Sequence, residues 1–179
     1  MKMKYVSVLV LAFLVFSVSV NYLINQNTDD KYYNSYEKQI NSTNKSMEYC
    51  QSAMSSIMLS MMGQNITNSN ITSDLMGANN STVMAINYSQ VMLSNAKTDS
   101  QKKYASLLLN QSNDMLKFID LLSILSVSTK DSIKVNNIMK QLDSIKSQEE
   151  SYQNDLDSIR STDNDLDKHL GGIEEKYKG

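Results

Sequence analysis

The sequence predicts an all-α protein in which an N-terminal transmembrane or signal helix precedes an elongated antiparallel bundle of three or four helices with coiled-coil-like packing. The first observation behind this prediction is that the 179 residues include no proline and only five glycines, so long helices can form without breaks. The second is that apolar residues recur at spacings of three and four through most of the chain. The third is that no stretch outside the N-terminal segment alternates with the period of a strand over a useful length.

Composition limits the classes of function. Serine and asparagine make up about a quarter of the residues, and both are weak helix formers, so the helices must be stabilised by packing. The net charge of −2 and the absence of a basic block argue against nucleic-acid binding. Cys50 is the only cysteine, which rules out an internal disulfide.

Residues 1–28 read as a targeting or anchoring segment. Lys2 and Lys4 precede a run without charge from residue 5 to residue 24. As a signal peptide, the segment has a positive start, a short apolar core and small residues at Ser17 and Ser19 for cleavage. As an uncleaved anchor, the uncharged run rises about 30 Å in a helix, enough to cross the hydrocarbon core. We favour the anchor because the run is longer than a signal peptide requires.

Both interpretations place residues 29–179 outside the cytoplasm, either in a single-pass protein of the cell membrane or in a protein secreted after cleavage near Ser19. Eight N-glycosylation sequons agree with this prediction, because the serine and threonine content of the region predicts only about three by chance. An Asn/Ser-rich composition without modification is the alternative. The asparagines of the sequons are Asn41, Asn44, Asn65, Asn70, Asn79, Asn80, Asn87 and Asn110.

The first helix of the bundle is predicted over about residues 29–62, and Gly63 ends it as a C′ glycine does. Thr43 is the only polar member of its apolar series. Residues 64–82 are polar and contain Gly77, so we expect a loop there, with room for one helical turn near residues 73–76. The apolar series comprises Tyr33, Tyr36, Ile40, Met47, Cys50, Met54, Ile57 and Met61.

A second helix is predicted over about residues 82–96. Its inner face is expected to carry Met84, Tyr88 and Val91. Thr98 and Gln101 then form a capping-box pattern, which either begins a third helix or lies inside a continuous one. The 3-4 spacing continues with Gln111 as its exception, through Tyr104, Leu108, Met115, Phe118, Leu122 and Leu125.

The last helix is predicted over about residues 130–176, with Ser128 or Thr129 as its cap and Asp131 in its first turn. Eleven of its thirteen core positions are apolar, and the exceptions are Glu149 and Asp163. Four explanations are open for these two acidic residues: they contact solvent, they fix the register of the helices, they pair with cations of a second chain, or they are imperfections at a wet end of the bundle. The apolar positions are Val135, Ile138, Leu142, Ile145, Tyr152, Leu156, Ile159, Leu166, Leu170, Ile173 and Tyr177.

The length of this last helix predicts a contact with another molecule. Its apolar series alone, from residue 135 to residue 177, spans roughly 65 Å and would overhang the other helices. Gly171 and Gly172 are expected to fray or bend its end. Residues 156–177 are therefore the predicted surface for a protein partner or a second copy.

No constellation of residues predicts catalysis, and we expect neither enzyme activity nor a cofactor. His169 is the only histidine and is interpreted as a solvated helix residue rather than a catalytic base. One cysteine and one histidine cannot form a zinc site, and no glycine-rich loop is present to bind phosphate. Carboxylate pairs such as Glu149 and Glu150 are interpreted as a solvated face.

Sulfur-containing residues offer two chemical alternatives. Seven methionines between residues 54 and 92 suit Cu(I) binding outside the cytoplasm, although methionine is more often an adaptable core filler. Cys50 is interpreted as a buried thiol, with an inter-chain disulfide as the alternative.

The predicted function is that of a non-enzymatic, membrane-anchored extracytoplasmic helical protein that acts as a surface scaffold, spacer or protein-binding module. One alternative is a sensory ectodomain, which would signal through a membrane partner because only about four residues precede the anchor. The other is a secreted, methionine-rich metal-binding protein. The expected partners are the membrane, through the N-terminal helix, and a protein or second copy, through the C-terminal helix.

Overall fold

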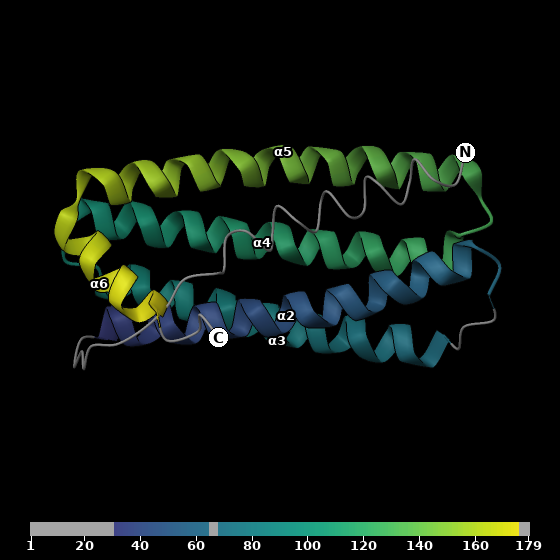
Figure 1. The fold of residues 1–179 in the computed structure, drawn as a ribbon, viewed down its shortest axis with the longest axis horizontal. Coiled ribbons are helices and arrows are strands. Elements are labelled where there is room, and N and C mark those ends of the chain that lie inside the picture. The colour runs from purple at the N-terminus through teal and green to yellow at the C-terminus, as the bar shows by residue number, and fades with distance from the viewer. Residues whose placement is uncertain (1–30, 65–67, 176–179) are drawn as a thin grey trace.

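The computed structural model describes residues 31–64 and 68–175 and confirms a helical bundle (Figure 1). The predicted N-terminal anchor or signal helix lies outside the described residues. The helices are α2 (Lys31–Met61), α3 (Asn68–Asn95), α4 (Asp99–Ser128), α5 (Ser132–Thr162) and α6 (Asn164–Glu174). None of these five helices is long and apolar enough to cross a membrane.

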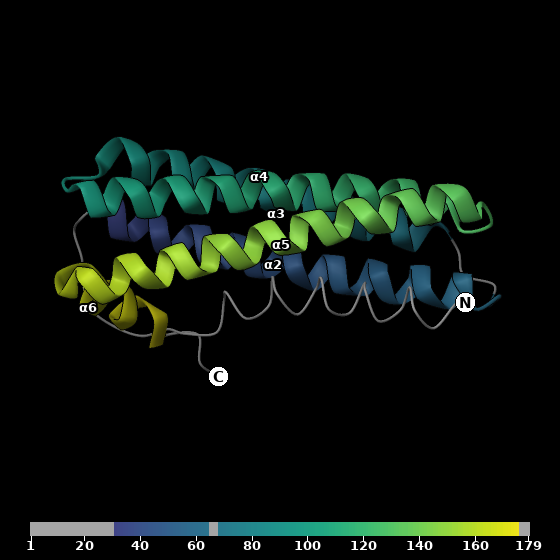
Figure 2. The same cartoon turned by 90° about the horizontal axis from the view of Figure 1, so that it is seen from above.

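Four long helices run alternately up and down along one axis, and α6 turns back across the end where α2 begins (Figures 1 and 2). Neighbours in sequence, α2 with α3, α3 with α4 and α4 with α5, are antiparallel neighbours in space. The α2–α3 and α4–α5 connections therefore share the opposite end of the bundle, which we call the tip.

Buried apolar side chains form two core clusters. The tip cluster lies toward the tip and includes Ile57, Ile71, Leu125 and Leu142. The α6-side cluster joins the start of α2 to α6 and comprises Tyr32, Tyr33, Tyr36, Ile40, Met92, Tyr104, Ala105, Leu108, Leu156, Ile159, Leu166, Leu170 and Ile173.

Several predicted boundaries are confirmed. Helix α2 covers the predicted first helix, and Gly63 follows it with a φ of +89°, a conformation that glycine adopts at little cost. Thr98 and Gln101 form a complete capping box that begins α4, so the third helix is separate from the second.

The predicted loop over residues 64–82 is wrong, because α3 already begins at Asn68. The predicted inner face is also wrong: Met84 and Val91 are 49% and 39% exposed. The face that α3 buries has the same 3-4 spacing but smaller residues, Ile71, Leu75, Ala78, Thr82, Ala85, Ser89 and Met92. Small side chains let the α2 and α3 backbones approach closely, and this packing outweighs the weak helix propensity of the segment.

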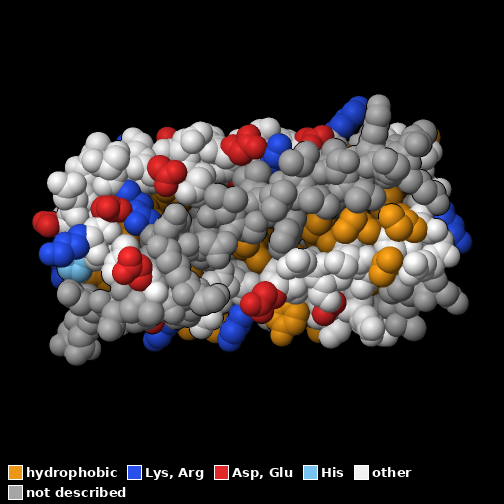
Figure 3. Space-filling view, in the orientation of Figure 1, with side chains coloured by type: hydrophobic (Ala, Val, Ile, Leu, Met, Phe, Trp, Pro, Cys, Tyr) orange, Lys and Arg blue, Asp and Glu red, His pale blue; other side chains and the backbone are white. Residues whose placement is uncertain are grey.

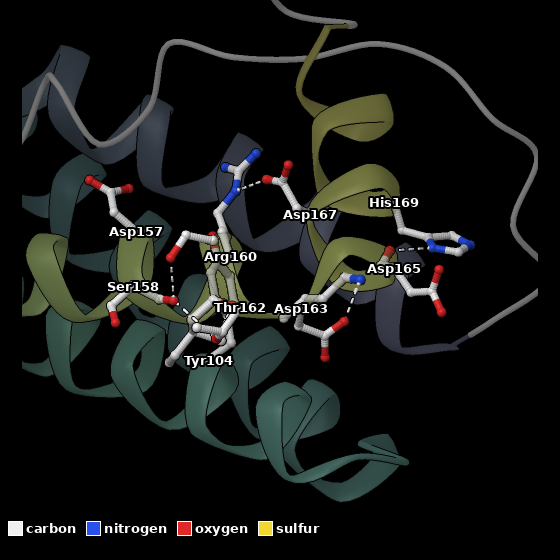
Figure 4. Close-up of polar contacts among 12 residues, drawn as sticks. Tyr104, Asp157, Ser158, Arg160, Thr162, Asp163, Asp165, Asp167 and His169 are labelled. Atoms are coloured by element: carbon white, nitrogen blue, oxygen red, sulfur yellow. Dashed lines mark hydrogen bonds and ion pairs between the residues drawn. The ribbon is translucent and has the colours of Figure 1, made fainter.

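The single long C-terminal helix over residues 130–176 is a second wrong prediction. The chain breaks at Asp163, whose backbone N–H donates to the Ile159 carbonyl and whose side chain accepts from the Leu166 N–H (Figure 4). Asp163 therefore ends α5 and caps α6. At the start of α5, the N-cap is Asp131 rather than Ser128 or Thr129.

Because of this break, the C-terminal segment does not overhang the bundle. Leu156, Leu166, Leu170 and Ile173 are all at most 4% exposed within the α6-side cluster. Arg160 Nε on α5 donates to Asp167 Oδ1 on α6 over 2.7 Å, which holds the corner (Figure 4). Gly171 and Gly172 lie within helical backbone, so they do not fray the end of α6.

Candidate functional site

The polar exceptions of separate apolar series meet in the middle of the bundle. Thr43 from α2, Gln111 from α4 and Glu149 from α5 line one small cavity of about 30 Å³. The cavity lies between the two core clusters, and its full lining is Gln39, Thr43, Ser46, Thr82, Ala85, Gln111, Ser112, Met115 and Glu149. We call this set the polar layer.

Part of the polar layer is satisfied by hydrogen bonds between α2 and α3. The Ser46 and Thr82 hydroxyl oxygens lie 2.6 Å apart, and the Ala78 carbonyl accepts from both hydroxyls, at 3.1 Å and 2.9 Å. On α4, Ser112 donates to the Leu108 carbonyl over 2.9 Å. The hydroxyl groups are thus largely paired with backbone or with one another.

Other polar atoms of the layer have no hydrogen-bond partner among the described residues. Glu149 is 1% exposed and neither of its carboxylate oxygens accepts a hydrogen bond. Gln39 is 3% exposed, and although its Nε2 donates to Thr43 Oγ1 over 3.2 Å, its Oε1 is unpaired. A buried polar atom without a partner costs free energy of about 1–3 kcal/mol, so this layer is not explained by stability.

Burial is the main reason that the pKa of Glu149 is raised to about 8, and the nearby Asp114 carboxylate raises the pKa further. The Gln111 amide lies close enough to lower this pKa somewhat, although its Nε2 does not reach hydrogen-bond geometry with either Glu149 oxygen. Asp114 is itself buried, but it pairs with Lys117, whose Nζ lies 2.5 Å from Asp114 Oδ1. Two interpretations from the sequence, that Glu149 lies at a wet end of the bundle or on a solvated face, are therefore wrong.

A second candidate surface lies at the tip. Its apolar side chains Met62, Ile124, Val127 and Ile133 are 59%, 49%, 79% and 73% exposed. Figure 3 shows that hydrophobic side chains on the face in view gather toward this half of the bundle. Single exposed apolar residues are common, but a group at one end of a bundle suits contact with another molecule.

The predicted glycosylation sites are spread along the bundle rather than gathered. Asn41, Asn70, Asn79, Asn80, Asn87 and Asn110 are exposed, Asn44 is half-buried, and Asn65 lies outside the described residues. All seven described asparagines lie within helices, whereas sequons that are used usually lie in surface loops.

The methionines do not form one cluster. Met54 is buried in the tip cluster, Met92 in the α6-side cluster, and Met76 and Met84 are exposed. Cys50 is 1% exposed and burial raises the pKa of its thiol to about 12, so an inter-chain disulfide would require the core to open. Among residues 31–64 and 68–175, no three side chains of His, Cys, Asp or Glu converge as metal ligands.

His169, interpreted from the sequence as a solvated residue, is exposed but stacks on Tyr33. The sequence signal for the polar layer was present in the exceptions Thr43, Gln111 and Glu149. Gln39 and Thr82 carried no signal, because neither falls in the apolar series that the sequence displays.

Comparison with known proteins adds no family to this description. No protein-family model, curated protein or solved structure matches the chain.

Proposed function

We propose that the protein is a non-enzymatic extracytoplasmic helical bundle, held at the membrane by residues 5–24, that acts as a surface spacer or protein-binding module. The observation that carries this proposal is the position of the exposed apolar tip. Met62, Val127 and Ile133 lie at the end opposite Lys31, where the chain enters α2 from its N-terminal segment.

This arrangement suits a spacer. Helix α2 has 31 residues and so rises about 46 Å from one end of the bundle to the other. With residues 5–24 anchored in the bilayer, the tip would therefore stand about 46 Å beyond the start of α2. The partner that fits the tip is a protein with an apolar patch, because the exposed side chains there are aliphatic or thioether groups.

The tip is tested by site-specific crosslinking in native membranes. A photoreactive amino acid replaces Val127, and a matched control replaces Lys102, whose side chain is 58% exposed at the opposite end of α4. We expect a discrete crosslinked protein from position 127 and none from position 102. Identical products from both positions, or none from position 127, would overturn the proposal.

The location is tested separately by carbonate extraction and intact mass. Retention of the N-terminal residues in the membrane fraction is the expected result. An intact mass that begins near Val20 would replace the anchor by a cleaved signal peptide. Additional mass in hexose units would support use of the sequons.

A sensory ectodomain that works through a membrane partner is the second candidate, and the polar layer favours it. Ligand sites in helical bundles are built in the core from side chains on facing helices, and the cavity is lined by all four long helices.

A further inference from the structure

The polar layer has the composition of a site for a cation. Its only ionisable lining residue is Glu149, and the remaining polar lining residues carry amides or hydroxyls. None of the nine lining residues is a lysine or arginine. We infer that this cavity binds a small monovalent cation, Na⁺ or K⁺, between the Glu149 carboxylate and the side-chain oxygen of Gln39. The inference does not depend on where the protein resides or on what its tip binds.

The first argument is the missing partner for Glu149. When ionised, a carboxylate that is 1% exposed requires a counter-charge or several hydrogen-bond donors. The described residues offer it no counter-charge and only the Gln111 amide as a donor, and that amide forms no hydrogen bond of normal geometry with either oxygen. Lys117 on α4 is engaged by Asp114, and Lys146 on α5 is engaged by Glu150. A bound cation would supply the absent charge.

The second argument is the set of donors. Glu149 Oε1 and Oε2 and Gln39 Oε1 are unpaired, and both side chains line the cavity. The Thr43 hydroxyl, which accepts from Gln39 Nε2, stands beside them as a further oxygen. Oxygen donors of this kind select hard cations over soft ones.

The charge of the site and the size of the cavity limit which cations can bind. One carboxylate balances one positive charge, whereas Ca²⁺ sites gather several carboxylates at six to eight oxygens. A cavity of about 30 Å³ exceeds the ~10–15 Å³ that one water needs, so a bare ion with one water fits. Organic cations as large as choline do not fit this volume.

Binding exchanges a proton for the cation. When Glu149 is protonated, entry of Na⁺ or K⁺ leaves the carboxylate bound to the ion and releases one proton to solvent. Asp114 is the charged group that acts on Glu149, and Tyr152 lies near both of these carboxyl groups and near Lys117. No charged residue of α2 or α3 lines the cavity.

The test is thermal unfolding of the full-length protein at constant ionic strength, with choline chloride replaced stepwise by NaCl or KCl. A ligand that binds only the native state raises Tm as its concentration passes Kd, and we expect a rise of about 2–4 °C by 200 mM. Glu149→Gln removes the charge and should abolish this rise. Glu150→Gln, on an exposed neighbour, should keep it.

Two further measurements keep the inference falsifiable if Glu149→Gln changes the fold. Gln39→Met retains the side-chain length but removes the side-chain oxygen. It should raise at least tenfold the Na⁺ or K⁺ concentration that is needed for the same rise in Tm. Equilibrium dialysis with radioactive sodium should show about one ion per chain in the natural protein and none in Glu149→Gln. Equal Tm values in choline, Na⁺ and K⁺, or an unchanged response in Glu149→Gln, would overturn the cation site in favour of a cavity that holds only water.

Discussion

The rings of Tyr33 and His169 are stacked, with their centroids 4.7 Å apart and their planes inclined by 12°. Tyr33 also accepts a 3.2 Å hydrogen bond at its hydroxyl from Gln101 Nε2, so one side chain of α2 contacts both α4 and α6. Gln101 in turn closes the capping box of α4 and accepts at its backbone carbonyl from the Tyr32 hydroxyl, 3.0 Å away. The start of the bundle is therefore held together by a few aromatic and amide groups rather than by apolar packing alone.

The Tyr33–His169 stack is expected to stabilise α6 on the bundle. A double-mutant cycle with Tyr33→Leu and His169→Ala should yield a coupling energy of about 0.5–1.5 kcal/mol, near the lower value because His169 is exposed. Urea unfolding followed by circular dichroism measures it. His169→Phe keeps an aromatic ring and should retain most of the coupling, and a coupling near zero in the cycle would show that the stack contributes nothing.

Removal of α6 is expected to destabilise the whole bundle. A protein that ends at Thr162 lacks Leu166, Leu170 and Ile173, each at most 2% exposed, and burial of each such side chain contributes about 1.5–3 kcal/mol. The measurement is the Tm of the shortened protein against that of the full chain. An unchanged Tm would mean that α6 is a free overhang, as the sequence alone had suggested.

The raised pKa of Glu149 predicts that stability falls as pH rises. Its native pKa is about 8 against an ordinary 4.5, so between these values the native state binds more protons than the unfolded state, and the free energy of unfolding decreases with pH. Each tenfold change in proton affinity corresponds to about 1.4 kcal/mol, so the loss approaches roughly 5 kcal/mol above pH 8.

This pH dependence is measured by urea unfolding from pH 5 to pH 9 with choline as the added cation. As pH rises, the natural protein should lose stability relative to Glu149→Gln. At the highest pH values the variant should have the larger free energy of unfolding. Glu150→Gln should follow the natural protein throughout. Parallel curves for Glu149→Gln and the natural protein would contradict the raised pKa.

The Gly77–Tyr49 contact predicts a coupled effect of two substitutions. A Cβ at Gly77 would meet three Tyr49 ring atoms at 2.9 Å, so Gly77→Ala should gain little in the natural protein. In a Tyr49→Ala background the same change should stabilise α3 by about 0.5–1 kcal/mol, because alanine favours a helix interior over glycine. Gly171→Ala is the matched control, since its Cβ would meet only Arg160 Nη2 at 3.8 Å. Equal gains from Gly77→Ala in both backgrounds would show that Tyr49 moves freely.

How far the sequence predicts the structure differs from helix to helix. In α2, α4 and α5, large apolar residues at 3-4 spacing identify the buried face, and Tyr36, Leu108 and Leu142 are buried as expected. In α3, the buried face carries Ala78, Thr82 and Ala85 instead. Small residues give little hydrophobic signal, so only the presence of a close neighbouring helix determines which face is buried.

The sequence by itself determined that the chain forms helices, where three of their buried faces lie, and that Thr43, Gln111 and Glu149 interrupt those faces. Only the tertiary structure decided that these three residues meet in one cavity. Their separation along the chain does not determine the height of each residue along the axis of an up-and-down bundle. The same holds for Asp163. Its place in a regular apolar series is compatible with a continuous helix, and only the packing of Leu166, Leu170 and Ile173 against the start of α2 makes a break and a reversal the more stable arrangement.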